Sequence, residues 1–429
     1  MTDNPWPMAN RLAVRKTLVS LLTVIPAVSV APAQVAEKAF IDYFLPTPIE
    51  GVLVSDLWGA PGGLPSEPKN GLEDITMKKG CHWDGKIIVV PLDGAALDRD
   101  LHDAPVVAPP AASRAAGADD ARGAVARKPL FRDPVFDGAA DPVIVWDREA
   151  KRHVMFYTNR RANAPGLSGV AWVHGTHIGM AESRDGGATW TYAGVAAVPA
   201  EVGETLWAPD VVYHEGFYHM FVSVVPGVFE DWKHPRNIVH LTSRDLRTWG
   251  DPTAVIVGSD RVIDPCVYRM PDGSWRLWYN DERAGKAISL AESPDLEHWT
   301  DRGKVLVERP GEGPKVFFWG GFYFMIVDEW AGLGVYRSTD ATSWIHQDGN
   351  LLATPGTGVD DEVKGGHADV VVSGSRAYLF YFTHPGRRGE DEKKDTTEQR
   401  RSSIQVAELQ LREGWLTCGR GPTRVKLEP

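Results

Sequence analysis

Four acidic residues and one histidine head similar apolar segments along the chain. They are Asp141, Asp210, Asp264, Glu312 and His367. Carboxyl groups that are brought together away from water resist ionisation, because burial and mutual repulsion both disfavour the charged form. Neighbouring carboxyls whose pKa values are held apart can divide the work of a general acid and a general base. These residue types therefore indicate acid–base chemistry, provided that the fold brings the five heads together.

The segments behind these residues form an internal repeat with two elements. The first is the polar motif, an apolar run, a turn and an alternating aromatic strand, as in the stretch from Asp141 to Asn159. The second is an apolar strand that ends in a Ser-x-Asp turn and a tryptophan, and SIQVAELQLREGW is a degenerate fifth copy. Four short strands in about 50 residues are typical of a β-propeller blade.

Five such repeats predict an all-β fold, a five-bladed β-propeller with an N-terminal extension. The inner strand of each blade lines the central channel, so the five motif heads are expected to converge at one end of it. The tryptophans that close the first four repeats are interpreted as core residues between blades. They are Trp190, Trp249, Trp299 and Trp344.

The chain before the first repeat is interpreted in three parts. Residues 1–33 combine basic residues, an apolar segment and an Ala-Pro-Ala site, which resembles a secretory signal and predicts a periplasmic or secreted protein. Residues 34–103 form an extension to which the sequence assigns no role. Residues 104–128 are rich in alanine and proline and are interpreted as a linker or surface loop. The catalytic propeller is expected over residues 129–429.

Composition excludes several classes of protein. The 429 residues contain 46 Lys and Arg against 57 Asp and Glu, a net charge of −11, which argues against a duplex nucleic-acid binder. Cys81, Cys266 and Cys418 are too few for a disulfide framework or a zinc knuckle. No apolar stretch reaches the roughly 18 residues of a membrane span. The oligomeric state is not indicated by the sequence.

The five motifs, in their order, resemble those of the five-bladed propeller glycosidases, most closely glycoside hydrolase family 43. The motifs are Asp-Pro at Asp141, Trp-Ala-Pro-Asp ending at Asp210, Ile-Asp-Pro around Asp264, Glu-Gly-Pro at Glu312 and Gly-Gly-His ending at His367. Each motif alone is a weak signal, but five in order, each heading a repeat, are a strong one. The resemblance covers Asp141 to about Pro385.

This resemblance implies an inverting, exo-acting glycoside hydrolase that cleaves oligosaccharides without a required cofactor. It implies Asp141 as the general base, Glu312 as the general acid and Asp264 as the carboxylate that tunes the acid. Inversion would need the base and acid carboxyls roughly 6.5–9.5 Å apart. His367 resembles the channel histidine that in many relatives lies beside a bound calcium ion or a water cluster, and a calcium ion there is expected to be structural. An α-L-arabinofuranoside or a β-xyloside is the default substrate by resemblance.

Other residues compete for the role of base. Asp84, in Trp-Asp-Gly-Lys, resembles another blade-opening motif and is the main rival to Asp141, and Asp133 and Asp137 lie close to Asp141 in the sequence. Substrate-binding candidates comprise aromatic rings for stacking on sugars and cations that would bind an acidic sugar or pair with a catalytic carboxylate. They are Arg160, Arg161, Trp207, Asp210, Lys315, Trp330 and His367.

Three alternatives to this function remain open. Glycoside hydrolase family 117, which acts on anhydro-galactose-type substrates, is also a five-bladed propeller and uses a histidine as acid, a role that would fall to His367. A related propeller transferase or phosphorylase would need a phosphate-binding cluster near the acid. A sugar-binding propeller without catalysis would be expected to lack Asp141 or Glu312, and both are present.

Overall fold

The computed structural model describes residues 82–83, 88–89, 123–306, 308–389 and 395–429. The chain divides into two units, Met1–Ser113 and Arg114–Pro429. In the first unit, β1 (His82–Trp83) pairs with β2 (Ile88–Val89). The predicted signal, most of the predicted extension and the rival base Asp84 lie outside the described residues.

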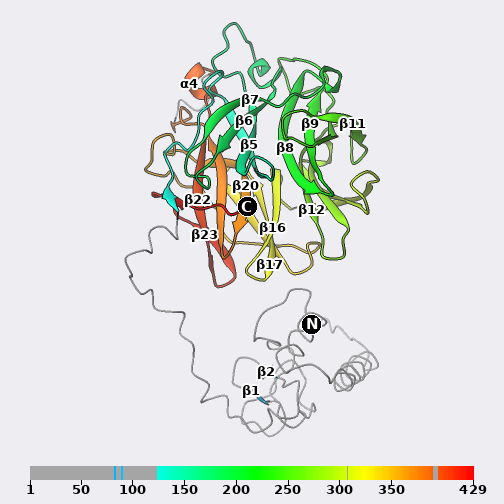
Figure 1. Cartoon of the computed structure of the whole chain (residues 1–429), viewed down its shortest axis with the longest axis vertical. Helices are drawn as coiled ribbons and strands as arrows, with labels where there is room; N and C mark the ends of the chain where they lie inside the picture. Colours follow the sequence, from blue (N-terminus) through cyan, green and yellow to red (C-terminus); the bar gives the residue numbers. More distant parts are fainter. Residues whose placement is uncertain (1–81, 84–87, 90–122, 307, 390–394) are drawn as a thin grey trace, which may run out of the picture. The chain divides into compact units, whose positions relative to one another are not determined.

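The second unit contains five four-stranded antiparallel sheets, as the sequence predicts for a five-bladed propeller (Figure 1). Blade one is β4 (Ala139–Asp147), β5 (Arg152–Asn159), β6 (Ile178–Ser183) and β7 (Thr191–Val195). Blade two is β8 (Thr205–His214), β9 (Phe217–Val225), β10 (Asn237–Ser243) and β11 (Gly250–Val255). Blade three is β12 (Val262–Arg269), β13 (Trp275–Asp281), β14 (Ala287–Ser293) and β15 (Thr300–Leu306). Blade four is β16 (Glu312–Trp319), β17 (Phe322–Asp328), β18 (Leu333–Ser338) and β19 (Ile345–His346), and blade five is β20 (Gly365–Ser373), β21 (Arg376–Thr383), β22 (Ser403–Arg412) and β23 (Trp415–Cys418).

The first strands of the blades form a closed ring. Each of β4, β8, β12 and β16 contacts the first strand of the next blade, and β20 contacts β4. Close to its N-terminal end, each of these strands contains a β-bulge in its pairing with the second strand. In four blades the bulge holds an X-Pro dipeptide, which begins at Asp141, Ala208, Asp264 or Gly313 with a φ of 51°, 43°, 58° or 59°. Because proline has no N–H to give to a ladder, it fits at a bulge, where a strand can also re-aim its side chains.

Hydrogen bonds from the preceding blade hold several of these strand starts in place. The hydroxyl oxygens of Thr158 and Ser223, near the ends of β5 and β9, accept the N–H groups of Ala208 and Asp264, each at 2.8 Å. In blade four, the Asp328 carboxylate accepts the N–H of His367 at 2.8 Å. The end of one second strand therefore fixes the bulge of the next blade.

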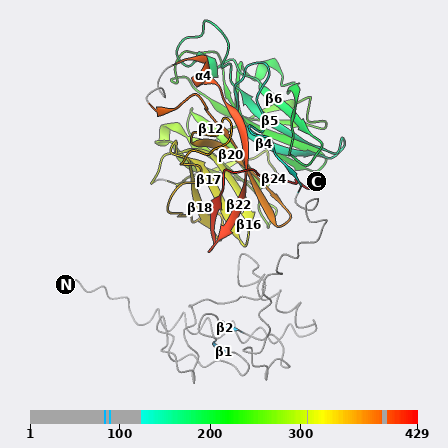
Figure 2. The same ribbon diagram turned by 90° about the vertical axis from the view of Figure 1, so that its left-hand side faces the viewer.

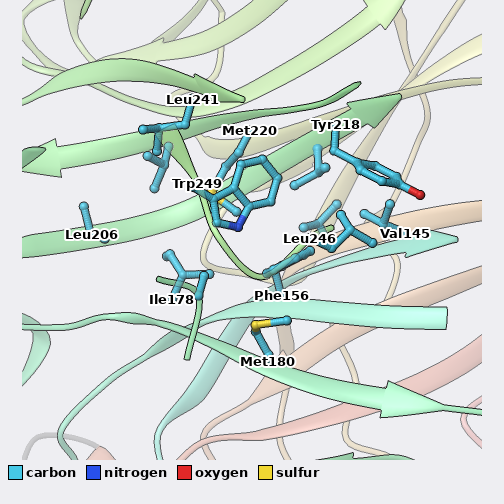
Figure 3. Packing of buried hydrophobic residues seen from close by; sticks show 14 of the residues in the cluster. Val145, Phe156, Ile178, Met180, Leu206, Tyr218, Met220, Leu241, Leu246 and Trp249 are labelled. Atoms are coloured by element: carbon cyan, nitrogen blue, oxygen red, sulfur yellow. The ribbon is translucent and has the colours of Figure 1, made fainter. Parts of the chain in front are cut away.

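The tryptophans that close the repeats pack between blades, as predicted. Trp249 of blade two is 2% exposed, and its ring lies 5.8 Å from that of Phe156 in blade one, within a cluster of aliphatic side chains and methionines (Figure 3). Equivalent ring pairs are Trp299 with Phe221, Trp344 with Trp278 and Trp190 with Phe380. The Ser-x-Asp turns before these tryptophans are closed by hydrogen bonds from Ser to Asp.

Chain segments from both ends of the second unit meet beside blades five and one. β3 (Ala124–Val125) pairs with β24 (Arg424–Val425), which lies near the C-terminus in Figure 2. Lys128, in the segment predicted as a linker, contacts the fully buried Asp361 at 2.7 Å, and Arg420 pairs with the same carboxylate. Near the C-terminal end of the propeller, α4 (Thr397–Arg400) begins at a Thr396 capping box. No helix among the described residues is long and apolar enough to cross a membrane.

Trp249→Ala tests whether the closing tryptophans join the blades. Removing a fully buried aromatic ring leaves a cavity between blades one and two, and we expect a loss of about 3–5 kcal/mol in the free energy of unfolding, measured with urea. Ile256→Ala is the control, because Ile256 is 81% exposed and surface changes alter stability by less than about 0.5 kcal/mol. Equal effects of the two substitutions would contradict this role.

Candidate active site

A cavity of about 610 Å³ lies at the end of the channel where the bulged strand starts converge. Its carboxylate lining consists of Asp141, Asp264, Glu282, Glu312 and Asp328. Its cationic lining consists of Arg160, Arg236, Lys286, Lys364 and Arg387. Trp172, Trp207, Trp232, Trp330 and Phe382 contribute aromatic surface. The cavity thus unites acid–base groups, cations and sugar-stacking rings in one place.

Asp141 lies in this cavity, and its carboxylate is paired with the guanidinium group of Arg160. The bulge of β4 presents its buried carboxylate, and Arg160 Nη2 lies 3.0 and 3.1 Å from the two carboxylate oxygens. His384 holds Arg160 from behind, with its Nε2 3.1 Å from Arg160 Nη1 and its Nδ1 2.9 Å from the Arg401 carbonyl oxygen. Burial and the charges of Arg387 and Arg160 hold the pKa of His384 well below its usual range. The neutral ring therefore donates from Nδ1 and accepts the Arg160 N–H at Nε2.

Asp264 occupies the equivalent bulge of blade three. Its carboxylate is 6% exposed and accepts the N–H of Gly313 from blade four at 2.9 Å. Burial, reinforced by the charges of Glu312 and Asp141, raises the pKa of Asp264 well above its usual value. Asp141 and Glu312, the other two carboxyls predicted to be catalytic, therefore both lie within electrostatic reach of Asp264.

Glu312 faces a carboxylate that sequence reasoning missed. Glu312 and Asp328 are directly opposite each other in the pairing of β16 with β17. Asp328 accepts N–H groups of Trp330 and His367, both at 2.8 Å, and burial together with the charge of Glu312 raises its pKa to about 7. The sequence did contain a signal, because the corresponding strands of the first three repeats carry neutral polar residues at this position. They are Thr158, Ser223 and Asn280.

Four of the predicted substrate-binding residues line the cavity. They are Arg160, Trp207, Trp330 and His367. The Trp207 indole donates to the Val173 carbonyl at 2.6 Å, whereas Trp330 is 38% exposed. His367 Nδ1 lies 3.6 Å from Asp141 Oδ1, so this ring stands beside the predicted base.

Asp210, Lys315 and Arg161 are not among the described lining residues. Lys315 Nζ lies 2.8 Å from both Asp210 and Asp369, and this network also accepts backbone N–H groups from β12 and β4. Although burial alone would lower the pKa of Lys315, the two aspartates hold it well above its usual value. Arg161 donates to the carbonyls of Ala171 and His174. These contacts connect chain segments, so the three side chains have a structural role in the propeller.

The rival bases Asp133 and Asp137 are likewise not among the lining residues. Asp133 accepts hydrogen bonds from Tyr157, Asn159 and two backbone N–H groups, and Asp137 pairs with Arg132. Several residues that line the cavity lie on the connections between strands, where no periodic signal marks them. They include Trp232, Arg236, Glu282, Lys286, Lys364 and Arg387.

The described residues offer no ready cage for the calcium ion predicted beside His367. Calcium takes six to eight oxygen ligands, but Asp141 already pairs with Arg160 and Asp328 already accepts two backbone N–H groups. No group of three or more His, Cys, Asp or Glu side chains in the described part of the chain is arranged to hold a metal ion. The proposed mechanism therefore uses the protein side chains alone.

A propeller with buried carboxyls at one end of its channel is an architecture suited to glycoside hydrolysis. The model of glycosyl hydrolases family 43 matches residues 131–416, and the chain belongs to this family. No curated protein matches the chain. The chain is a glycoside hydrolase by family, as its motifs predict.

Two solved structures with a TM-score of 0.50 support the fold, and a third structure is similar at a lower score. A thermostable family-43 glycoside hydrolase is 19% identical, with a TM-score of 0.50 over 70% of this chain and 98% of that one. A mutant of a family 43 protein from Bacillus licheniformis is 18% identical, with a TM-score of 0.50 over 70% of this chain and 58% of that one. A family 43 β-xylosidase/α-arabinofuranosidase from a compost microbial metagenome, in complex with xylotriose, is 15% identical, with a TM-score of 0.49 over 66% and 96%.

Asp328→Asn should stabilise the protein more at pH 8 than at pH 5. With a folded pKa of about 7 against 3.8 in the unfolded chain, ionised Asp328 costs stability progressively as the pH rises toward 7. We expect the gain in the free energy of unfolding to be larger at pH 8 by about 1–3 kcal/mol, measured by urea unfolding.

Asp245→Asn is the matched control for this linkage. Although burial raises the pKa of Asp245, N–H groups of Thr248 and Arg247 hold it below its usual value. Asp245 is therefore ionised at both pH 5 and pH 8, and Asp245→Asn should lower the free energy of unfolding by the same amount at both pH values. A gain from Asp328→Asn that did not change between the two pH values would refute the proposed burial cost.

Proposed function

We propose that this protein is an inverting, exo-acting glycosidase of soluble oligosaccharides, with Glu312 as acid and Asp141 as base. The observation that carries the proposal is the contrast between the surroundings of the carboxyls in one cavity. Asp141 lies under a guanidinium group, Asp264 is buried among carboxyls, and Glu312 has a side chain that is 29% exposed. Such contrasts separate acid from base.

In this mechanism two protons move and one glycosidic bond breaks. Glu312 gives its proton to the glycosidic oxygen as that bond to the anomeric carbon breaks. Asp141 accepts a proton from the water that attacks the anomeric carbon from the opposite face. Arg160 keeps the Asp141 carboxylate oriented, and Asp264 is assigned as the third carboxyl of the site, which accepts the N–H of Gly313 next to Glu312. Proton exchange with solvent then restores both carboxyls.

In this proposal the substrate is an α-L-arabinofuranoside or a β-xyloside, an assignment that rests on family membership. The 610 Å³ cavity can enclose a terminal sugar, in keeping with exo action. Residues 1–33 would direct export, so that the enzyme meets its substrates in the periplasm or outside the cell.

Glu312→Gln tests the acid. On aryl glycosides of α-L-arabinofuranose, β-xylose, β-galactose, and uronic or anhydro sugars, we expect one sugar to be released by the wild type. The variant should lose about 10²- to 10⁴-fold in kcat with a poor leaving group, and much less with an activated one that needs no proton. Glu292→Gln, on β14 and paired with Arg302, is a control outside the cavity lining. Equal activity of wild type and Glu312→Gln would contradict the assignment.

The stereochemistry of the product tests the geometry independently. Because Asp141 is assigned to activate water and not to attack the sugar, the first product should have the anomeric configuration opposite to that of the substrate. Proton NMR during the first minutes of turnover distinguishes the anomers before mutarotation mixes them. A first product of retained configuration would require a nucleophilic carboxylate and would overturn the mechanism.

A further inference from the structure

Beside Glu312, charged side chains of alternating sign form one wall of the cavity. Arg236 Nε lies 2.9 Å from Glu282, and its guanidinium also donates to the Trp232 carbonyl. Lys286 Nζ lies 3.5 Å from Glu282 and 3.5 Å from Glu312. The charges therefore run in the order Arg236, Glu282, Lys286, Glu312.

The Lys286 ammonium group is held loosely in this row. A direct N–H···O bond spans about 2.7–3.2 Å, and both carboxylates lie beyond that distance from Nζ. The side chain is 39% exposed, and Nζ lies 4.9 Å from the centre of the Trp330 ring. The ammonium thus has N–H groups to offer to an oxygen of a bound molecule, next to an exposed aromatic ring.

The wall acquires a surplus positive charge in the state that reacts. A general acid must carry its proton before it acts, so Glu312 is then neutral. Among the ion pairs of this row, Arg236 and Lys286 then share one carboxylate, Glu282. The nearby carboxyl of Asp264 has a pKa raised well above its usual value by burial and by the charges of Glu312 and Asp141, which favours its neutral form. This local surplus stands against a net charge of −11 for the whole chain, so it does not follow from overall composition.

Exposure indicates which part of a substrate would meet Lys286. Asp141 and Asp264 are each 6% exposed, so the sugar whose bond is broken must lie deep against them. Trp330, at 38% exposed, and Lys286 lie toward solvent on the Glu312 side. Because Glu312 protonates the oxygen of the departing group, that group lies next to Lys286 and Trp330.

We propose that Lys286 binds an anionic substituent, a carboxylate or a sulfate, on the sugar that leaves. The substrate would then be an oligosaccharide in which a terminal neutral sugar is attached to an acidic unit. This inference rests on the proposed function, since it assumes Glu312 as the acid.

Matched leaving groups test this site. We would measure kcat/KM for α-L-arabinofuranosides and β-xylosides of phenol with a carboxylate, a sulfate ester or a neutral carboxamide at the meta position. The wild type should prefer one of the anionic aglycones over the carboxamide by roughly tenfold, and the preference should decline with added salt. The better anion identifies the substituent.

Lys286→Gln should abolish this preference, and Lys286→Arg should retain it. For each variant we would take the ratio of kcat/KM for the anionic aglycone to kcat/KM for the neutral one, and divide it by the wild-type ratio. This division cancels the intrinsic reactivity of the leaving groups. Lys304→Gln, an exposed lysine on β15 of the same blade, removes the same charge outside the cavity and should leave the ratio unchanged. Unchanged preference in Lys286→Gln would overturn the assignment.

Calorimetric titration with the same compounds separates this inference from the proposed function. If the glycosides of all three aglycones were hydrolysed without a preference for an anionic one, the anion site would be refuted and the proposed glycosidase function would stand. No hydrolysis, with tighter binding of an anionic compound that Lys286→Gln removes, would support the anion site and refute the catalytic proposal. Neither hydrolysis nor selective binding would refute both.

Discussion

The β-bulge at the start of each inner strand is the constraint on which the cavity depends. In blades one and three it turns Asp141 and Asp264 to φ values of 51° and 58°, a conformation that few residues other than glycine adopt. Side chains of the preceding blade and of the ring hold the strand starts. Without the closed ring, neither the strained backbone nor the crowded carboxyls would persist, because both cost free energy that packing between blades must offset.

The order of motifs predicts the fold and the three carboxyls, but it does not align the residues correctly between blades. In the structure, Asp141, Asp264 and Gly313 are equivalent, whereas Glu312 precedes the bulge and Asp210 follows it. Glu312 lies one residue before Gly313, whereas Asp210 lies two residues after Ala208, the equivalent position in blade two. Asp210 is therefore past the bulge, in the regular part of β8, where its carboxylate contacts Lys315 and accepts the N–H of Val267, although its motif resembles the others.

What the sequence conceals lies where the repeat is broken. Lys286 and Trp232 lie on the connections between the second and third strands of their blades, which differ in length and sequence from blade to blade, so periodicity carries no information about them. Asp328 does lie within the repeat, and the sequence shows that it stands where the first three repeats have a neutral polar residue. Only the pairing of β16 with β17 shows that it faces Glu312.

The site combines a tightly held base with a loosely held acid. Asp141 is fixed through Arg160 and His384, a chain that ends on the backbone carbonyl of Arg401. Among the described residues, the one ion pair of Glu312 is the contact with the Lys286 ammonium at 3.5 Å, and the Glu312 side chain is partly exposed. This difference suits their roles, because a base that aims one water molecule gains from rigidity. An acid must approach the oxygen of a departing group and then be protonated again from solvent, which requires both freedom and access.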